Sequence, residues 1–283
     1  MRASMRGAAL RREPQAAERI PYTAHVSPSV IATEHGDYVQ VFRLAGASFE
    51  SADDEQLNTW HERLNVLWRN IASPHIALWA HVIRRRERTI ASFARESGFA
   101  GHLEEKYRRR IAGETLMVNE LYLSLVYRPA SGVATSLAGK LLSRTHADGA
   151  RVDLADALDT CEKLAQTLGA SLARYEPDLL SVYRHEGRWF SRPLEFLSYL
   201  VTGEHQRVPL PRSPIRQVLA TTRLFFGIEA IEYRMPTETR IGAMLGIKEY
   251  PTPTLVGMFD RLLSAPFPFV LTQSFSFLTK GAG

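Results

Sequence analysis

The sequence predicts a mixed α+β (α/β) fold. Short runs of β-branched and aromatic residues, which are typical of strands, alternate along the chain with longer stretches of helical period. A β-α-β order occurs near both ends, in residues 38–83 and 241–278. Interleaved elements of both kinds argue against an all-α or all-β fold. We therefore expect two β-α-β-containing lobes with mixed sheets, and the ferredoxin-like arrangement is the candidate for each.

The first lobe is expected over residues 20–129. Residues 38–44 read as a strand, and residues 76–83 are apolar on nearly both faces, as a buried central strand would be. The order strand, helix, strand predicts that these two strands run parallel. Between them, five apolar residues recur at helical spacing, namely Leu57, Trp60, Leu64, Leu67 and Ile71. A charged helix over residues 103–111 and a strand over residues 121–127 complete this lobe.

The helix between those strands has acidic residues at its start. Ser51 followed by Asp54 three residues later resembles a capping box. Asp53, Asp54 and Glu55 then fall in the first turn, where the helix dipole favours negative charge. The acidic run could also attract a metal ion, but dipole matching is the simpler interpretation.

The second lobe is expected over residues 151–283. Residues 130–150, rich in Ser, Gly, Ala and Thr, are expected to be a linker or mobile loop. A helix is predicted after Asp153 from the apolar stripe Leu154, Leu158, Cys161, Leu164, Ala165, Leu168 and Leu172. Pro193 predicts the start of a second helix that ends near Gly203. The remaining predictions are strands at 179–183, 217–226, 230–234, 241–250 and 267–278, and a helix at 254–263.

The positive charge of the chain is local. The 283 residues have a net charge of +5. Residues 1–19, which we expect to form a flexible basic arm, contribute +3, and residues 84–110 contribute +5. Such a patch suits an acidic partner, an anionic membrane surface or nucleic acid. Alternatively, mixed Arg and Glu simply solvate a helix face.

Two arginine triplets within residues 84–110 are the candidate docking residues. The first directly follows the apolar strand of residues 76–83, which puts its guanidinium groups at a strand end where α/β folds often contact ligands or partners. The six residues are Arg84, Arg85, Arg86, Arg108, Arg109 and Arg110.

Motifs for catalysis are incomplete in this sequence. The nearest approach to a phosphate loop, residues 134–141, has Ala134 where the first glycine is needed and Leu141 where Ser or Thr would hold magnesium. Ser48 lacks the second glycine of a nucleophile elbow. The nine histidines are scattered, without the spacing of a zinc site. We therefore predict no catalytic, nucleotide-binding or metal-ligating residue.

Several residues whose side chains could act in catalysis or binding are better explained as residues of the hydrophobic core. His81 lies in an apolar strand, and Cys161 falls on the apolar stripe of its helix. Cys161 is also the only cysteine, which rules out an internal disulfide and favours a reducing compartment. Trp60 and Trp79 are expected to be buried, whereas Trp68 is ambiguous.

Motifs along nearly the whole chain, residues 20–280, resemble the VirB/TrbE/CagE family, the large ATPases of type IV secretion and conjugal transfer systems. The resemblance is to the N-terminal region of these proteins, and its motifs occur in one order. They are residues 20–22, 78–86, 105–107, 116–123, 127–129, 179–183, 193–197, 203–205 and 269–275.

The resemblance implies an α/β N-terminal domain that precedes a RecA-like motor. It implies ATP and magnesium for the full-length family member, residence at the cytoplasmic face of the bacterial inner membrane, docking to small inner-membrane channel subunits, and a homo-oligomer. No Walker A or Walker B sequence is found here, so no catalytic residue is carried over and we expect this chain alone to be inactive. An assembly domain is the first hypothesis. A nucleic-acid-binding module using residues 84–110, or an unrelated enzyme with a dispersed site, are the alternatives.

Overall fold

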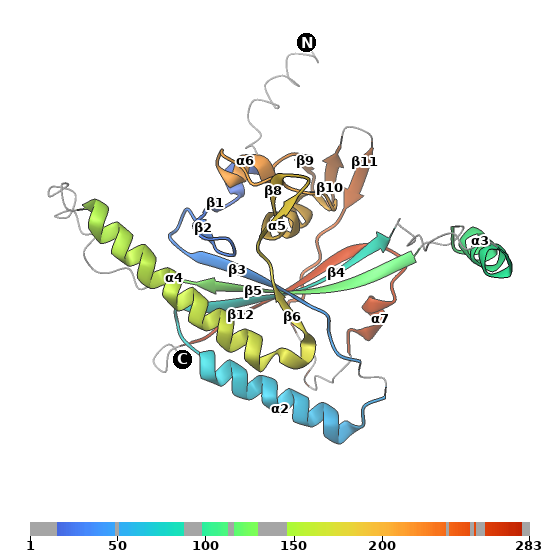
Figure 1. Cartoon of the computed structure of the whole chain (residues 1–283), viewed down its shortest axis with the longest axis horizontal. Helices are drawn as coiled ribbons and strands as arrows, with labels where there is room; N and C mark the ends of the chain where they lie inside the picture. The colour runs from blue at the N-terminus through green and yellow to red at the C-terminus, as the bar shows by residue number, and fades with distance from the viewer. Residues whose placement is uncertain are drawn as a thin grey trace, which may run out of the picture.

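The computed structural model describes residues 16–48, 51–87, 98–112, 116–129, 146–235, 238–249, 252 and 258–278. Figure 1 shows a central sheet with helices on both of its faces. Most of the predicted basic arm (residues 1–15) and of the predicted linker (residues 130–145) lies outside the described residues.

The central sheet has seven strands in the order β1-β2-β3-β5-β4-β12, and β6 pairs with β3 beside this path. Every neighbouring pair is antiparallel, so the prediction of mixed sheets is wrong. β3 and β4 do run in the same direction, as the sequence predicts, but β5 lies between them. The strands are β1 (Tyr22–His25), β2 (Ile31–Thr33), β3 (Tyr38–Leu44), β4 (Ile76–Glu87), β5 (Leu116–Tyr127), β6 (Pro177–Leu179) and β12 (Phe269–Ser276).

Part of this sheet has ferredoxin-like topology. The elements β3, α2 (Asp54–Ile71), β4, β5, α4 (His146–Ser171) and β6 follow the order β-α-β-β-α-β, and their strands lie in the order β6-β3-β5-β4. The mixed α+β class is therefore confirmed. Among the described residues the ferredoxin-like unit is a single one, however, and its elements come from both predicted lobes. Because β12 also joins the sheet, strands from both predicted lobes share it.

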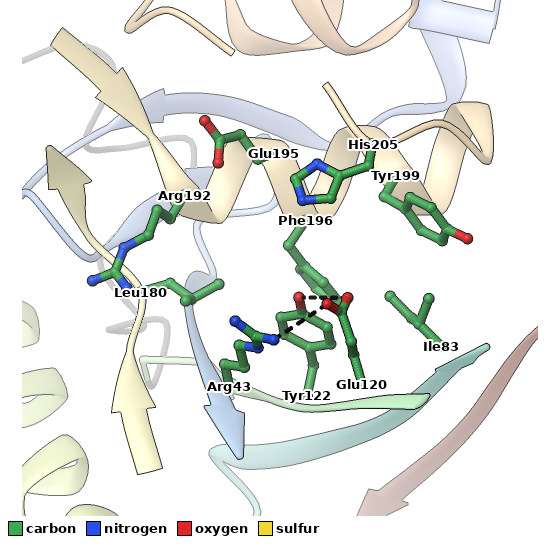
Figure 2. A pocket seen from close by; sticks show the side chains of 10 residues that line it. All are labelled: Arg43, Ile83, Glu120, Tyr122, Leu180, Arg192, Glu195, Phe196, Tyr199 and His205. Carbon is green, nitrogen blue, oxygen red and sulfur yellow. Dashed lines mark hydrogen bonds and ion pairs between the residues drawn. The ribbon is translucent and has the colours of Figure 1, made fainter. Parts of the chain in front are cut away.

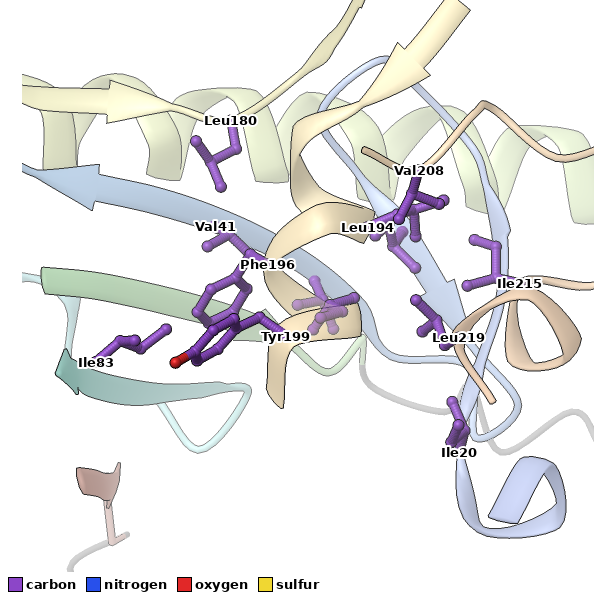
Figure 3. Packing of buried hydrophobic residues seen from close by; sticks show 13 residues of the cluster. Ile20, Val41, Ile83, Leu180, Leu194, Phe196, Tyr199, Val208, Ile215 and Leu219 are labelled. Carbon is purple, nitrogen blue, oxygen red and sulfur yellow. The ribbon is translucent and has the colours of Figure 1, made fainter. Parts of the chain in front are cut away.

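Alternating side chains along the strands fill two cores, one on each face of the sheet. On one face, Phe42 and Leu78 pack against α2 and α4 around Leu168. On the opposite face, Val41 packs beneath α5 (Arg192–Thr202) and α6 (Ile215–Leu219), as Figure 3 shows. Helices thus cover both faces, which explains why β3, β4 and β5 are apolar on both sides.

Local signals explain where the principal helices begin and end. Asp53, rather than Ser51, is the N-cap of α2, and its carboxylate accepts a hydrogen bond from the Gln56 amide at 2.8 Å. Ser191 caps α5 in the same way, accepting from the Leu194 amide at 3.2 Å. Gly203 ends α5 in the left-handed conformation with φ of 69°, which favours glycine. The predicted start at Pro193 and end near Gly203 are confirmed.

The second half contains smaller sheets that the sequence did not predict. β7 (Val182–His185) and β8 (Arg188–Ser191) form a hairpin. β9 (Arg223–Phe226), β10 (Ile231–Arg234) and β11 (Thr239–Gly242) form a three-stranded antiparallel sheet. β11 and β12 therefore belong to different sheets, and the β-α-β repeat predicted for residues 241–278 is wrong. Short helices complete the description: η1 (Ala16–Arg19), α3 (Phe99–Ala112), η4 (Ala173–Tyr175) and α7 (Asp260–Leu263).

Three predictions of element type in the second half are wrong in part. Residues 217–219 belong to α6, and only Arg223–Phe226 is a strand. Ile215 and Leu219 are four residues apart and both buried, so they lie on one face of the helix. The apolar residues that follow in the sequence made this segment resemble a strand. Residues 243–249 form no strand. Of the helix predicted at 254–263, only Asp260–Leu263 lies in a described helix. Residues 254–257 lie outside the described residues.

Of the four residues predicted as core, His81 and Cys161 are confirmed, whereas Trp60 is only half-buried, with the Arg174 guanidinium carbon 3.5 Å from the centre of its ring. His81 is 5% exposed, with its ring nitrogens 3.0 Å from Thr272 Oγ1 and 3.4 Å from Ser124 Oγ. Cys161 is buried, and burial raises the pKa of its thiol to about 11. Trp79 is 41% exposed, so its prediction was wrong. It lies two residues from His81 and therefore on the same face of the sheet.

His81 is expected to make the fold sensitive to mild acid. Burial lowers the pKa of His81 to about 4, so the unfolded chain binds this proton more readily than the folded chain does. Stability from this group is complete above the unfolded pKa and is lost as pH falls from about 6.5 toward 4, by at most about 3 kcal/mol. The variant His81→Gln should flatten this pH dependence in urea unfolding followed by circular dichroism.

The matched control is His61→Gln, at an exposed position on α2. It should unfold with the pH dependence of the wild type. An unchanged acid slope in His81→Gln would contradict the assignment.

Candidate docking surface

Arg84 holds the end of the central sheet together. It is 8% exposed; its Nε donates to the Ala265 carbonyl at 2.5 Å and its Nη1 to Asn119 Oδ1 at 2.9 Å. Asn119 Nδ2 in turn donates to the Leu263 carbonyl at 3.0 Å. Arg84 thus joins β4 to β5 and to the segment after α7. It is not exposed for contact with a partner in this conformation.

Arg85 is likewise engaged, in a charge cluster centred on Glu120 of β5. Arg85 Nη2 donates to Glu120 at 3.0 Å, and its Nη1 donates to Glu87 at 2.9 Å. Arg43 of β3 and the Tyr122 hydroxyl also donate to Glu120, each at 3.2 Å. The cluster therefore links three neighbouring strands on one face of the sheet.

The cluster changes the titration of its members. Burial by itself would raise the pKa of Glu120, but the hydrogen bond from Arg85 and the charges of Arg85 and Arg43 outweigh it, so the pKa is lowered. Burial and the negative charge of Glu120 together raise the pKa of Tyr122. Glu120 is consequently an ionised acceptor in a structural network.

A small cavity lies between this cluster and α5. Figure 2 shows Arg43, Glu120 and Tyr122 on the sheet side, with Phe196 and other side chains of α5 opposite. Its volume is about 100 Å³, well below the roughly 300 Å³ at which ligand pockets usually begin. The complete lining is Arg43, Ile83, Glu120, Tyr122, Leu180, Arg192, Glu195, Phe196, Tyr199 and His205. The site has charged groups but little room for a ligand.

The second arginine triplet lies on α3, which stands beyond the ends of β4 and β5 and apart from the layered core (Figure 1). Arg108 pairs with Glu104 and Arg109 with Glu105, each across one turn of the helix. Arg110 is exposed, as is Arg86 at the end of β4. The structure therefore separates the six predicted docking residues into a structural pair, Arg84 and Arg85, and four that lie at the periphery.

Exposed apolar side chains form a second peripheral feature that the sequence analysis missed. They lie on β9, on β11 and on the segments next to them; we call them the β9–β11 surface. Met244 and Leu245 are 85% and 94% exposed, and Ile228 is fully exposed. The set consists of Phe226, Ile228, Ile241, Met244 and Leu245. Gly242 and Gly246 on either side of the pair Met244–Leu245 were the available signal that a strand ends here.

The described residues contain no group of three or more His, Cys, Asp or Glu side chains arranged to hold a metal ion. Within the same part of the chain, no helix combines the length and apolar character needed to cross a bilayer.

Comparison with known proteins defines the class. Residues 29–134 match the family model of the type IV secretion system ATPase VirB4/TrbE, N-terminal domain. Residues 178–282 match that of the CagE, TrbE, VirB family, a component of the type IV transporter system. The two matches lie in the order predicted from the motifs, and together they identify a type IV secretion component.

Curated relatives agree with this class over the whole chain. The identity is 41% over 275 residues with the type IV secretion system protein virB4 of Bartonella quintana, 34% over 281 residues with virB4 of Brucella suis, and 35% over 276 residues with PtlC of Bordetella pertussis. These alignments cover 96%, 97% and 95% of this chain but 35%, 34% and 33% of the relatives. The chain belongs to the VirB/TrbE/CagE family of type IV secretion ATPases, and it spans about a third of the length of these relatives.

The Glu120 cluster is expected to stabilise the fold. In Glu120→Gln, Arg85 and Arg43 lose the carboxylate that neutralises them in a partly buried site, which should cost about 2 kcal/mol of unfolding free energy. Urea unfolding at neutral pH measures this loss. The matched control is Glu105→Gln, which removes a carboxylate that is 57% exposed and should cost less than about 0.5 kcal/mol. Equal losses in the two variants would contradict a structural role for the cluster.

Proposed function

We propose that these residues form the N-terminal assembly and docking domain of a type IV secretion (conjugal transfer) ATPase. In this proposal the domain lies at the cytoplasmic face of the bacterial inner membrane and anchors a RecA-like motor to small inner-membrane channel subunits. The motor, which would bind ATP and magnesium, and the homo-oligomer belong to the full-length family member. Family membership and the distribution of exposed apolar residues support the proposal.

The observation that carries the proposal is the β9–β11 surface. Monomeric soluble proteins rarely leave neighbouring large apolar side chains exposed unless another surface covers them. Ile228, Ile241, Met244 and Leu245 are each at least 78% exposed, on elements outside the layered core. A helix of a membrane subunit that leaves the bilayer would offer a complementary apolar stripe. We therefore assign protein docking to this surface.

The alternative, nucleic-acid binding by residues 84–110, has less support. Phosphate binding needs basic side chains that are free to exchange counterions. Arg84 and Arg85 are engaged in the sheet, and Arg108 and Arg109 have carboxylate partners. No feature of the described residues specifically favours this function.

Channel binding is expected to depend on Met244 and Leu245. The tagged 283-residue chain should retain detergent-solubilised inner-membrane channel subunits from its own secretion system. In Met244→Asp/Leu245→Asp, retention should fall at least about tenfold, since each apolar side chain covered by a partner contributes about 1.5 kcal/mol or more. Affinity capture followed by quantitative immunoblotting measures the change.

The control for this experiment is Val66→Asp on α2, an exposed apolar position outside the β9–β11 surface. It should leave subunit capture unchanged. If Met244→Asp/Leu245→Asp captures the channel subunits as well as the wild type does, the β9–β11 surface is not the docking surface.

Nucleotide turnover provides a separate test. The purified 283-residue chain should show no magnesium-dependent phosphate release above a blank, because its sequence has no Walker A motif. A coupled ATPase assay measures this. Magnesium-dependent ATP hydrolysis that remains after further purification of the chain would contradict a role limited to assembly and docking.

A further inference from the structure

Helix α3 (Phe99–Ala112) has an exposed apolar stripe. Phe99, Leu103 and Tyr107 follow one another at intervals of four residues and are 83%, 57% and 62% exposed. At 3.6 residues per turn this spacing advances by about 40° around the helix, so the three residues and Ile111 span about 120° of one side. An apolar stripe of this width normally packs against a core or a partner. Here Phe99, Leu103 and Tyr107 are exposed, and Ile111 is half-buried.

The charges of α3 are arranged around this stripe. Glu104 and Glu105 are each paired with an arginine four residues later, at 2.7 Å in the case of Arg108 and Glu104. Lys106 and Arg110 are exposed, and their helical positions lie within about 20° of Phe99. Lys106 therefore borders the stripe at its Phe99 edge, and Arg110 lies within the stripe one turn beyond Lys106. Both carboxylates of the helix are paired with arginine.

The position of α3 suits contact with an extended surface. It stands beyond the ends of β4 and β5, away from the helices that cover the sheet (Figure 1). A 14-residue helix is about 21 Å long, too short to span a bilayer but sufficient to lie along one. Interfacial helices combine Phe, Leu or Trp on one face with Lys or Arg beside it, so that the apolar face enters the headgroup boundary and the cations meet anionic lipid.

We propose that α3 binds the surface of an anionic phospholipid bilayer, with Phe99, Leu103 and Tyr107 inserted and with Lys106 and Arg110 at the headgroups. The long aliphatic stems of Lys106 and Arg110 lie along the stripe while their charges reach the phosphates. Charge complementarity favours this occupant over an apolar protein groove, which would leave the two cations against an apolar wall. The inference takes its cellular setting from the proposed function, but it depends only on residues of α3.

Vesicle co-sedimentation of the intact 283-residue chain tests the proposal. The wild type should bind vesicles of equal parts phosphatidylglycerol and phosphatidylcholine, and bind phosphatidylcholine vesicles much more weakly. Leu103→Asp should lower the partition coefficient on anionic vesicles about tenfold. Lys106→Gln/Arg110→Gln should lower it roughly thirtyfold on anionic vesicles and leave the weak binding to neutral vesicles unchanged.

The matched control is Val66→Asp, which replaces an apolar residue of α2 that is 53% exposed, close to the exposure of Leu103. It should bind anionic vesicles like the wild type. Circular dichroism and thermal melting establish that each variant is folded. Three results would overturn the proposal. They are no binding by the wild type, equal binding of the wild type to both kinds of vesicle, and wild-type binding by folded Leu103→Asp. Because the vesicles contain no protein, these outcomes are independent of channel-subunit capture through Met244 and Leu245.

Discussion

The paired strands β4 and β5 are the constraint on which the rest of the structure depends. They form an unbroken antiparallel ladder from Ile76 opposite Tyr127 to Glu87 opposite Leu116. In the part nearer Ile76, one face packs against α2 and α4, so Leu78 and Leu125 are each 1% exposed. Toward Glu87 the β4 side chains become charged, from Arg84 to Glu87. The register that packs the core therefore also aligns the charged residues of the two strands.

The strand register brings the hydrogen-bond donors of the Glu120 cluster together. A carboxylate that is only 9% exposed is costly unless donors replace its water. Arg85 comes from β4, Arg43 from β3 and Tyr122 from β5 itself, so the donors require three strands to be correctly paired. Any slip of one residue would turn these side chains to the opposite face. The cluster and the ladder thus support each other.

The sequence predicted those elements whose causes are local. Helix α5 was located because Pro193 and Gly203 act within a few residues of their positions. Arg84 was expected at a docking surface because it directly follows an apolar strand; its partners Asn119 and Ala265 are 35 and 181 residues away. The exposure of Trp79 and the separation of β11 from β12 are also tertiary effects. Of the candidate docking surface, the basic character of α3 could be predicted, but the apolar β9–β11 surface could not.

Under the proposed function, docking and folding make separate demands on this chain. The layered core is already complete, since Leu168 and Leu194, on opposite faces of the sheet, are both 0% exposed. The exposed apolar side chains of α3 and of the β9–β11 surface therefore add nothing to that core, and they remain a liability in water unless another surface covers them. Because they lie on elements outside the helical layers, a partner can bind them without repacking the sheet. A buried core with exposed apolar surfaces at its periphery is the arrangement that the proposed assembly role requires.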